Sequence, residues 1–180
     1  HIVLSFSLSK LGLPGLRTGI VIAAPEIVST LSAINAVVSL ANTNVGQELV
    51  APLISTGKLS EDCRNFISPF YSEKRKQALE WVEEFFPSDL PWRIHICEGA
   101  LFFWLWAKEL PLTSRDFYEH LKQRGVLVVP GSYFFFGLDD PWAHREECIR
   151  INYSQPEETV REGLRIIGSE LKQAYLAPCR

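Results

Sequence analysis

The sequence predicts an α/β protein, because short runs of β-branched and apolar residues alternate with stretches in which apolar residues recur every three or four positions. Its 180 residues are enough for one good core or two small ones. Hydrophobic residues make up 47% and charged residues 22%, which is ordinary for a globular protein. A formal net charge of −3 does not indicate a general nucleic-acid or membrane surface, so we expect neither as a partner.

Two strands joined by a turn are expected at the start of the chain. The apolar run Ile2–Phe6 is typical of a buried strand, and Gly19–Ala24 is typical of a second one. Between them, Gly12, Pro14 and Gly15 oppose a regular helix and favour a tight loop. The residues just before this loop therefore lie past a strand end, where open α/β sheets place their ligands.

Helices are expected over the next part of the chain. Pro25 suits a first helical turn, and apolar residues recur at helical spacing over Ile27–Val38. A polar loop, Asn42–Gly46, separates this helix from a shorter one over Gln47–Ile54.

The remaining residues predict a long helix followed by a small α/β unit. Ser60 is suited to cap the long helix, which ends at Pro87. Four strands follow, at Arg93–Cys97, Leu101–Trp106, Val126–Val129 and Cys148–Tyr153. A helix over Thr113–Gln123 lies between the second and third strands, and Ser154 with Glu157 fits a capping box for a final helix. The final helix has apolar residues in register at Val160, Leu164, Ile167 and Leu171.

One lysine stands out because of the residues around it. Lys10 follows two serines, Ser7 and Ser9, and Arg17 lies seven positions downstream, within the glycine-rich turn. A lysine amine can form a Schiff base, whereas hydroxyls and a guanidinium are suited to hold a phosphate. Pyridoxal phosphate needs both, because its aldehyde must meet an amine while its phosphate is held still. For Lys10 taken alone, a solvated lysine beside a common turn is the plainer interpretation.

The whole run resembles the cofactor-lysine motif of fold-type I pyridoxal-phosphate aminotransferases, S-x-S-K-x-x-x-x-G-x-R-x-G. The resemblance continues in Gly125–Ser132, which is similar to the family's segment GV-x-V-x-PG. It also includes Ile149–Tyr153, which is similar to the strand that carries the substrate-carboxylate arginine.

Carried over by position, the motif implies roles for four residues. Lys10 would be catalytic and would hold pyridoxal 5'-phosphate covalently. Ser7 and Arg17 would bind the cofactor phosphate, and Ser9 would line the site. No metal is expected.

Arg150 is the candidate for binding the substrate. Side chains alternate along a strand, so Arg150 shares a face with Cys148 and Asn152, between apolar neighbours. A cation in such a strand is costly unless it finds an anion. An ion pair with Glu98 or Glu147 would supply one. The resemblance favours instead the α-carboxylate of an amino acid, bound bidentately, with Arg150 as the substrate-binding residue.

Several aromatic residues allow more than one interpretation. Tyr133 and the run Phe134–Phe136 could wall an apolar substrate pocket or could form core. Trp104 and Trp106 are more typical of core than of a cofactor contact. His144 has no partner pattern and is expected at the surface.

The resemblance also implies how the chain is organised. Residues 1–57 would end the large cofactor-binding domain, residues 58–90 would form a long interdomain helix, and residues 91–180 would form the small C-terminal domain. Because the sequence has no methionine and opens directly before a strand, we expect the C-terminal portion of a longer protein. We expect this portion to be inactive by itself and the full-length protein to be a homodimer.

The expected activity is transamination, with an amino acid and a 2-keto acid as partners. The resemblance is nearest to members of the family that use valine, alanine, pyruvate and 2-oxoisovalerate. Related C–S lyases and aminocyclopropane-carboxylate synthases have similar lysine motifs, and some transcription regulators contain an aminotransferase-like effector domain, so these alternatives stay open. No signal peptide is visible, and a cytoplasmic location is the default expectation.

Overall fold

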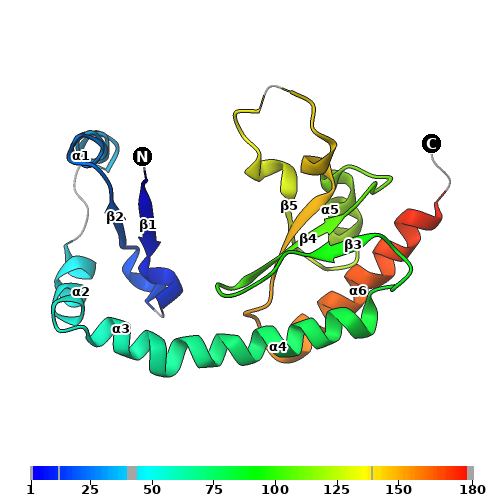
Figure 1. The fold of residues 1–180 in the computed structure, drawn as a ribbon, viewed down its shortest axis with the longest axis horizontal. Coiled ribbons are helices and arrows are strands. Elements are labelled where there is room, and N and C mark those ends of the chain that lie inside the picture. Colours follow the sequence, from blue (N-terminus) through cyan, green and yellow to red (C-terminus); the bar gives the residue numbers. More distant parts are fainter. Residues whose placement is uncertain (1, 12, 40–43, 139, 178–180) are drawn as a thin grey trace. The chain divides into compact units, whose positions relative to one another are not determined.

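The computed structural model describes residues 2–11, 13–39, 44–138 and 140–177. The chain forms two compact units, residues 1–69 and residues 70–180, called unit 1 and unit 2 below. Strands and helices occur in both units (Figure 1), which confirms the α/β class.

Unit 1 begins with a two-stranded antiparallel sheet. Strand β1 (Leu4–Ser7) pairs with strand β2 (Gly19–Ile22). The loop between them contains two 3₁₀ turns, Leu8–Leu11 and Pro14–Leu16. Both predicted strands and the tight loop between them are therefore confirmed. Glycine and proline oppose a regular helix in this loop.

The expectation that the first strand is buried is wrong for this structure. Leu4 and Phe6 are 47% and 49% exposed, and the other residues of β1 are exposed as well. An apolar run predicts a strand, but its burial also requires a neighbour over the face of the sheet. Among the strands of the described residues, β1 pairs only with β2.

Two helices of unit 1 follow the sheet. Helix α1 (Pro25–Ser39) and helix α2 (Val45–Ser55) confirm the two predicted helices. Helix α2 begins inside the predicted polar loop, of which Asn42–Thr43 lie outside the described residues. No residue of α1 is buried.

A long helical segment comes next. Helix α3 (Lys58–Asp62) leads through a π-helical turn, Cys63–Ile67, into helix α4 (Ser68–Phe85). The prediction that Ser60 caps this segment is wrong, because Ser60 lies inside α3. Gly57 occupies the N-cap instead, with a φ of 73° that glycine adopts without steric cost. The helix can therefore begin before the serine is reached.

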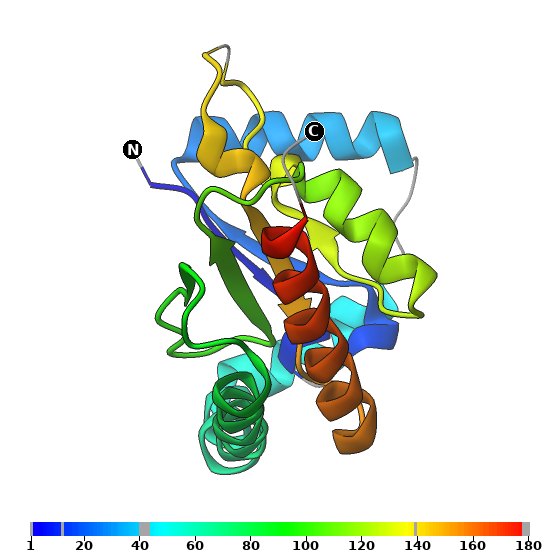
Figure 2. The ribbon, with the colours of Figure 1, turned by 90° about the vertical axis from the view of Figure 1, so that its right-hand side faces the viewer.

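Unit 2 is built on a four-stranded antiparallel sheet in the order β3-β4-β6-β5 (Figure 1). Its strands are β3 (Trp92–Ile94), β4 (Phe102–Ala107), β5 (Val129–Pro130) and β6 (Cys148–Asn152). Helix α5 (Ser114–Gln123) and helix α6 (Glu157–Leu176) lie side by side, as Figure 2 shows. The other predicted strands and helices of this unit are confirmed, but the strand predicted at Val126–Val129 is limited to Val129, the first residue of the two-residue β5.

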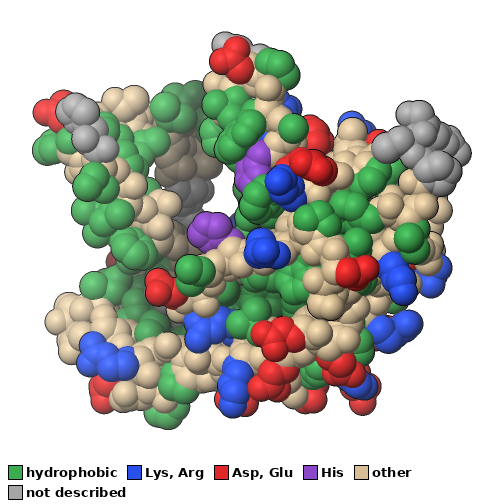
Figure 3. Space-filling view, turned by 45° about the vertical axis from the view of Figure 1, so that its right-hand side comes forward, with side chains coloured by type: hydrophobic (Ala, Val, Ile, Leu, Met, Phe, Trp, Pro, Cys, Tyr) green, Lys and Arg blue, Asp and Glu red, His purple; other side chains and the backbone are tan. Residues whose placement is uncertain are grey.

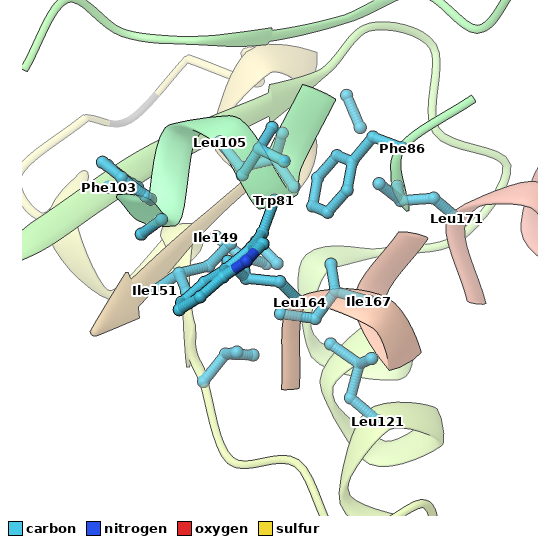
Figure 4. Packing of buried hydrophobic residues seen from close by; sticks show 14 of the residues in the cluster. Trp81, Phe86, Phe103, Leu105, Leu121, Ile149, Ile151, Leu164, Ile167 and Leu171 are labelled. Atoms are coloured by element: carbon cyan, nitrogen blue, oxygen red, sulfur yellow. The ribbon is translucent and has the colours of Figure 1, made fainter. Parts of the chain in front are cut away.

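One face of this sheet carries the core of unit 2. Along β4, Phe103, Leu105 and Ala107 are buried, and the residues between them point to the opposite face. The buried residues pack with Ile149 and Ile151 of β6 (Figure 4). The helices complete the cluster with Trp81, Val82, Phe117, Leu121, Val160, Leu164, Ile167 and Leu171. The predicted apolar register of the final helix is therefore confirmed.

The two helices beside this sheet begin differently. Thr113 caps α5, because its Oγ1 accepts a hydrogen bond from the backbone N–H of Asp116 at 3.1 Å. The capping box predicted for α6 is wrong, since Pro156 is the N-cap and no side chain caps it. Ser154 Oγ donates instead to Asn152 Oδ1 at 2.7 Å. The Ser154 hydroxyl thus forms a hydrogen bond with Asn152, at the end of β6, instead of capping α6.

Candidate functional site

The predicted cofactor residues follow strand β1, on a turn that Leu8 anchors. Its side chain is fully buried, and its backbone N–H donates to the Thr18 carbonyl at 3.1 Å. The Leu8 carbonyl accepts the N–H of Leu13, also at 3.1 Å. These bonds join both ends of the loop, so Ser9 and Lys10 are held in a defined turn at the end of β1.

Arg17 follows the second turn of the loop in a left-handed backbone conformation, with a φ of 48°. A non-glycine residue in this region needs support from its surroundings. Thr18 Oγ1 gives part of that support by donating to the Leu16 carbonyl at 2.8 Å. Gly46, in the first turn of α2, packs so closely that an added Cβ would lie 2.9 Å from the Leu16 carbonyl oxygen and would overlap Thr18 Oγ1.

Gly46 was expected in the polar loop between two helices, and its close approach to Leu16 and Thr18 was not predicted. The signal available in the sequence was a glycine next to a predicted helix. A glycine there costs conformational entropy, and this cost is offset where another segment of the chain must approach the backbone closely. The buried position of Gly46 shows that such an approach exists.

A hollow of about 280 Å³ lies along this loop and β2. Ser7, Ser9 and Arg17, three of the residues predicted to bind the cofactor, line it together. Two hydroxyls and a guanidinium supply hydrogen-bond donors that suit the oxygens of a phosphate. The structure thus brings these three side chains together, while their roles stay predictions.

Lys10 lies on the same 3₁₀ turn, directly after Ser9, and is exposed. The amine and the donors of the hollow therefore belong to one short loop. A primary amine in this position can act as a nucleophile toward an aldehyde and, when neutral, as a base.

Arg150 lies on β6, half-buried, on the face of the sheet opposite the core. Its guanidinium carbon is 4.4 Å from the centre of the Phe102 ring and 4.9 Å from the centre of the Phe134 ring. Within the described part of the chain, no carboxylate oxygen lies within 4.0 Å of its nitrogens. Among the described residues, the faces of these two rings are therefore the partners that attract the guanidinium of Arg150.

Glu147, one of the two acids that could have paired with Arg150, is engaged elsewhere. Its Oε2 accepts the indole N–H of Trp106 at 2.7 Å, and its Oε1 accepts the backbone N–H of Glu109 at 2.8 Å. Glu98, the other candidate, makes no ion pair among the described residues. The ion-pair interpretation of Arg150 is therefore wrong for this structure.

The aromatic residues of this face form a cluster of their own. Phe134 is 40% exposed and Tyr133 63% exposed, so neither belongs to the core. Trp104 meets the edge of Phe134 at 5.2 Å, whereas Leu105 between the two tryptophans is buried. His144, expected at the surface, is half-buried, with ring centres 5.2 Å from Trp106 and 4.8 Å from Trp142. The contacts of Trp104 with Phe134 and of Trp106 with His144 join residues far apart in sequence, so local patterns could not reveal them.

Two buried titratable groups support the sheet. The thiol of Cys148 is fully buried, and burial raises its pKa from 9.0 to about 11. Burial also raises the pKa of Tyr153, whose hydroxyl donates to the Ala100 carbonyl at 2.7 Å. Both groups are neutral at pH 7, so they pack and hydrogen-bond without adding charge near Arg150.

Other kinds of site find no support in the described residues. They contain no group of three or more His, Cys, Asp or Glu side chains that could hold a metal ion. Nor does any helix among them combine the length and apolarity needed to cross a bilayer. Acidic and basic side chains are interspersed on the face drawn in Figure 3.

Comparison with known proteins links both sites to one family. The family model described as aminotransferase class I and II matches residues 1–167. Valine–pyruvate aminotransferase of Escherichia coli is 40% identical over 175 residues, which are 97% of this chain and 42% of that protein.

Solved structures agree with this comparison. Valine–pyruvate aminotransferase of Salmonella typhimurium superposes with a TM-score of 0.86 at 39% identity, over 98% of this chain and 45% of that one. The multiple substrate aminotransferase of Thermococcus profundus superposes with a TM-score of 0.75 at 28% identity, over 97% of this chain and 41% of that one. This chain therefore spans about two fifths of the length of the relatives that it matches.

Proposed function

Because the chain belongs to the aminotransferase class I and II family, we propose that it carries the cofactor lysine and the substrate-binding arginine of a pyridoxal-phosphate-dependent transaminase. The reaction moves an amino group between an aliphatic amino acid, valine or alanine, and a 2-keto acid, pyruvate or 2-oxoisovalerate. The name of the Escherichia coli relative, valine–pyruvate aminotransferase, supports this choice of substrates. Enzymes of this family use pyridoxal 5'-phosphate.

The observation that carries the proposal is the hollow lined by Ser7, Ser9 and Arg17, on the loop that bears Lys10. These donors fit a phosphate, which presents several negatively charged oxygens and prefers hydroxyl and guanidinium partners. Lys10 Nζ would bind the aldehyde carbon of the cofactor. When bound, pyridoxal phosphate supplies an electron sink for the bond that breaks at the substrate α-carbon.

Lys10 and Arg150 have separate tasks in this reaction. Arg150 binds the substrate α-carboxylate through two parallel N–H···O bonds, which orients the bonds of the α-carbon. Lys10 Nζ, once the incoming amino acid has displaced it, accepts the α-proton as a general base. As a general acid it would then deliver that proton to the former aldehyde carbon of the cofactor instead of the α-carbon, and water would release the first 2-keto acid. The 2-keto acid of the second half-reaction would take the same path in reverse.

Product analysis tests the reaction directly. The full-length protein, supplied with pyridoxal phosphate, is incubated with valine and pyruvate, and the amino and keto acids are separated by chromatography. We expect alanine and 2-oxoisovalerate to form in equal amounts. If neither forms while a sulfur-containing amino acid is cleaved to a thiol, the protein is a C–S lyase and the proposal fails.

The organisation of the protein is part of the same proposal. We assign residues 1–57 to the end of a cofactor-binding domain, residues 58–90 to an interdomain helix and residues 91–180 to a small domain. The boundary between the two compact units, after residue 69, falls within the middle segment and supports this division. The full-length protein is proposed to be a cytoplasmic homodimer, for which light scattering and cell fractionation are the tests.

A further inference from the structure

The guanidinium of Arg150 lies over two aromatic rings that come from different elements. Phe102 is the first residue of β4, and Phe134 ends the 3₁₀ turn Gly131–Phe134. The two ring centres are 4.4 Å and 4.9 Å from the guanidinium carbon. Both distances are within the range in which a cation is attracted to an aromatic face.

The sheet holds the Phe102 side of this arrangement in place. In the ladder between β4 and β6, Phe102 lies opposite Asn152 and Trp104 lies opposite Arg150. Phe102 and Arg150 therefore occupy diagonal positions on one face of the sheet, where long side chains can reach each other. The buried core on the other face keeps both strands in register.

The Phe134 side is held by the turn that follows β5. Gly131, at the start of this turn, packs against the backbone of Cys148 so closely that there is no room for a Cβ. At the other end of the turn, the Phe134 ring meets the Trp104 ring edge-on, at 5.2 Å and an interplanar angle of 88°. The ring is therefore supported both through its backbone and through its neighbour.

We propose that Phe134 and Phe102 are positioning residues that prepare Arg150 for the substrate carboxylate. Rings stacked on a guanidinium cover its faces and leave its edge, with the N–H donors in one plane, to accept a carboxylate. They also restrict the rotation of a long side chain before substrate arrives, which lowers the ordering cost of binding. This inference rests on the proposed function, because it assumes that Arg150 binds the carboxylate.

Phe134 is the better of the two residues to test. It is 40% exposed and is not a member of the hydrophobic cluster of unit 2, so its replacement should leave the fold intact. Tyr133 offers a matched control, since it is the preceding aromatic residue and is 63% exposed. Within the described part of the chain, Tyr133 is not one of the rings stacked on Arg150.

The experiment compares Phe134→Leu, Phe134→Tyr and Tyr133→Leu in the full-length protein. Steady-state kinetics with valine and pyruvate give kcat and KM, and calorimetry gives the Kd of 2-oxoisovalerate. For Phe134→Leu we expect KM for both substrates and Kd to rise about 3- to 10-fold, with kcat within about 2-fold of the parent. Phe134→Tyr keeps the aromatic face and should restore the parent values, and Tyr133→Leu should not change them.

Outcomes that overturn the inference are distinct from those that overturn the proposed function. The inference is wrong if Phe134→Leu leaves KM and Kd unchanged, or if Phe134→Tyr is as impaired as Phe134→Leu. Arg150→Lys separates the two hypotheses, because loss of the bidentate fork should raise KM about 30-fold or more. If Arg150→Lys has no effect, the carboxylate assignment itself fails and the inference fails with it.

Discussion

The two units of the chain hold their hydrophobic residues in opposite ways. Unit 2 buries them in one cluster between its sheet and its helices. In unit 1, Leu8 and Val50 are the buried hydrophobic residues among those described, while α1 buries nothing. Apolar side chains such as Val37 and Val38, 80% and 77% exposed, lie at the surface of unit 1 instead.

This contrast decides what supports each candidate site. Arg150 lies on a sheet whose opposite face is a packed core, so its backbone is held by burial. The Lys10 loop is held by backbone hydrogen bonds, by the buried Leu8 side chain and by the close approach of Gly46. Substitutions near Arg150 should therefore act by disturbing the packed core, whereas substitutions near Lys10 should act on the hydrogen bonds and close contacts of its loop.

The largest effect is expected from replacing Lys10 itself. Lys10→Ala removes both the amine that binds the cofactor aldehyde and the base for the α-proton. In the full-length protein we expect turnover of valine and pyruvate to fall by roughly 10⁴-fold, together with the absorbance of the lysine-bound cofactor. Lys10→Arg keeps a positive charge without a usable amine and should be equally inactive. Turnover within 10-fold of the parent in either variant, measured spectrophotometrically, would falsify the assignment of Lys10.

A pair of leucines tests the contrast between the units. Leu164 of α6 is 1% exposed within the core of unit 2, whereas Leu31 of α1 is 41% exposed. Leu164→Ala should lower the free energy of unfolding by about 2–5 kcal/mol, because it leaves a cavity. Leu31→Ala should change it by less than about 0.5 kcal/mol. Urea titration of the 180-residue chain, followed by tryptophan fluorescence for unit 2 and by circular dichroism for all helices, gives both values.

Equal effects at the two leucines would contradict the contrast. A cost above about 2 kcal/mol for Leu31→Ala would mean that α1 is buried in solution, since an exposed side chain has little surface to lose.

The motif around Lys10 shows how far local sequence can predict a site. Ser7, Ser9 and Arg17 line one hollow because the glycine and proline between them allow a tight loop, which their spacing predicted. The apolar periodicity of α6 likewise predicted its buried face. In these cases the physical cause lies within a few residues of its effect.

The features that escaped prediction depend on neighbours distant in sequence. The burial of β1 requires a partner over its face, which its own residues cannot specify. The contacts of Arg150 with the rings of Phe102 and Phe134 need both the β4–β6 register and the turn after β5. Ser60 failed as a cap for a local reason, because Gly57 was interpreted only as the end of one helix and not as the start of the next.

Gly46 tests whether close packing in unit 1 supports the Lys10 loop. Gly46→Ala would force a Cβ onto the Leu16 carbonyl and Thr18, next to Arg17 in its left-handed conformation. We expect a loss of about 1–3 kcal/mol in stability and a weaker affinity of the full-length protein for pyridoxal phosphate, measured by fluorescence titration. Gly15→Ala is the control, because its Cβ would meet nothing within 4 Å in the same loop. If both alanines bind the cofactor equally well, Gly46 does not position Arg17.

The smallest effect concerns the pH dependence of unit 2. Burial raises the pKa of Cys148 from 9.0 to about 11, so the folded state favours the neutral thiol more than the unfolded state does. The stabilisation that this preference gives the folded state is fully present below pH 9 and is lost as the pH rises toward 11. The free energy of unfolding should therefore fall by about 1–2 kcal/mol more between pH 8.5 and pH 10.5 in the parent than in Cys148→Ala.

Urea titrations at the two pH values provide this measurement, and comparison of parent and variant cancels the contributions of other groups. Tyr175, whose pKa burial raises to about 12, titrates in both proteins alike. A parent and a Cys148→Ala variant with parallel pH profiles would show that the thiol is hydrated in solution, and that the sheet face shared by Cys148 and Arg150 is packed less tightly there than the full burial of Cys148 indicates.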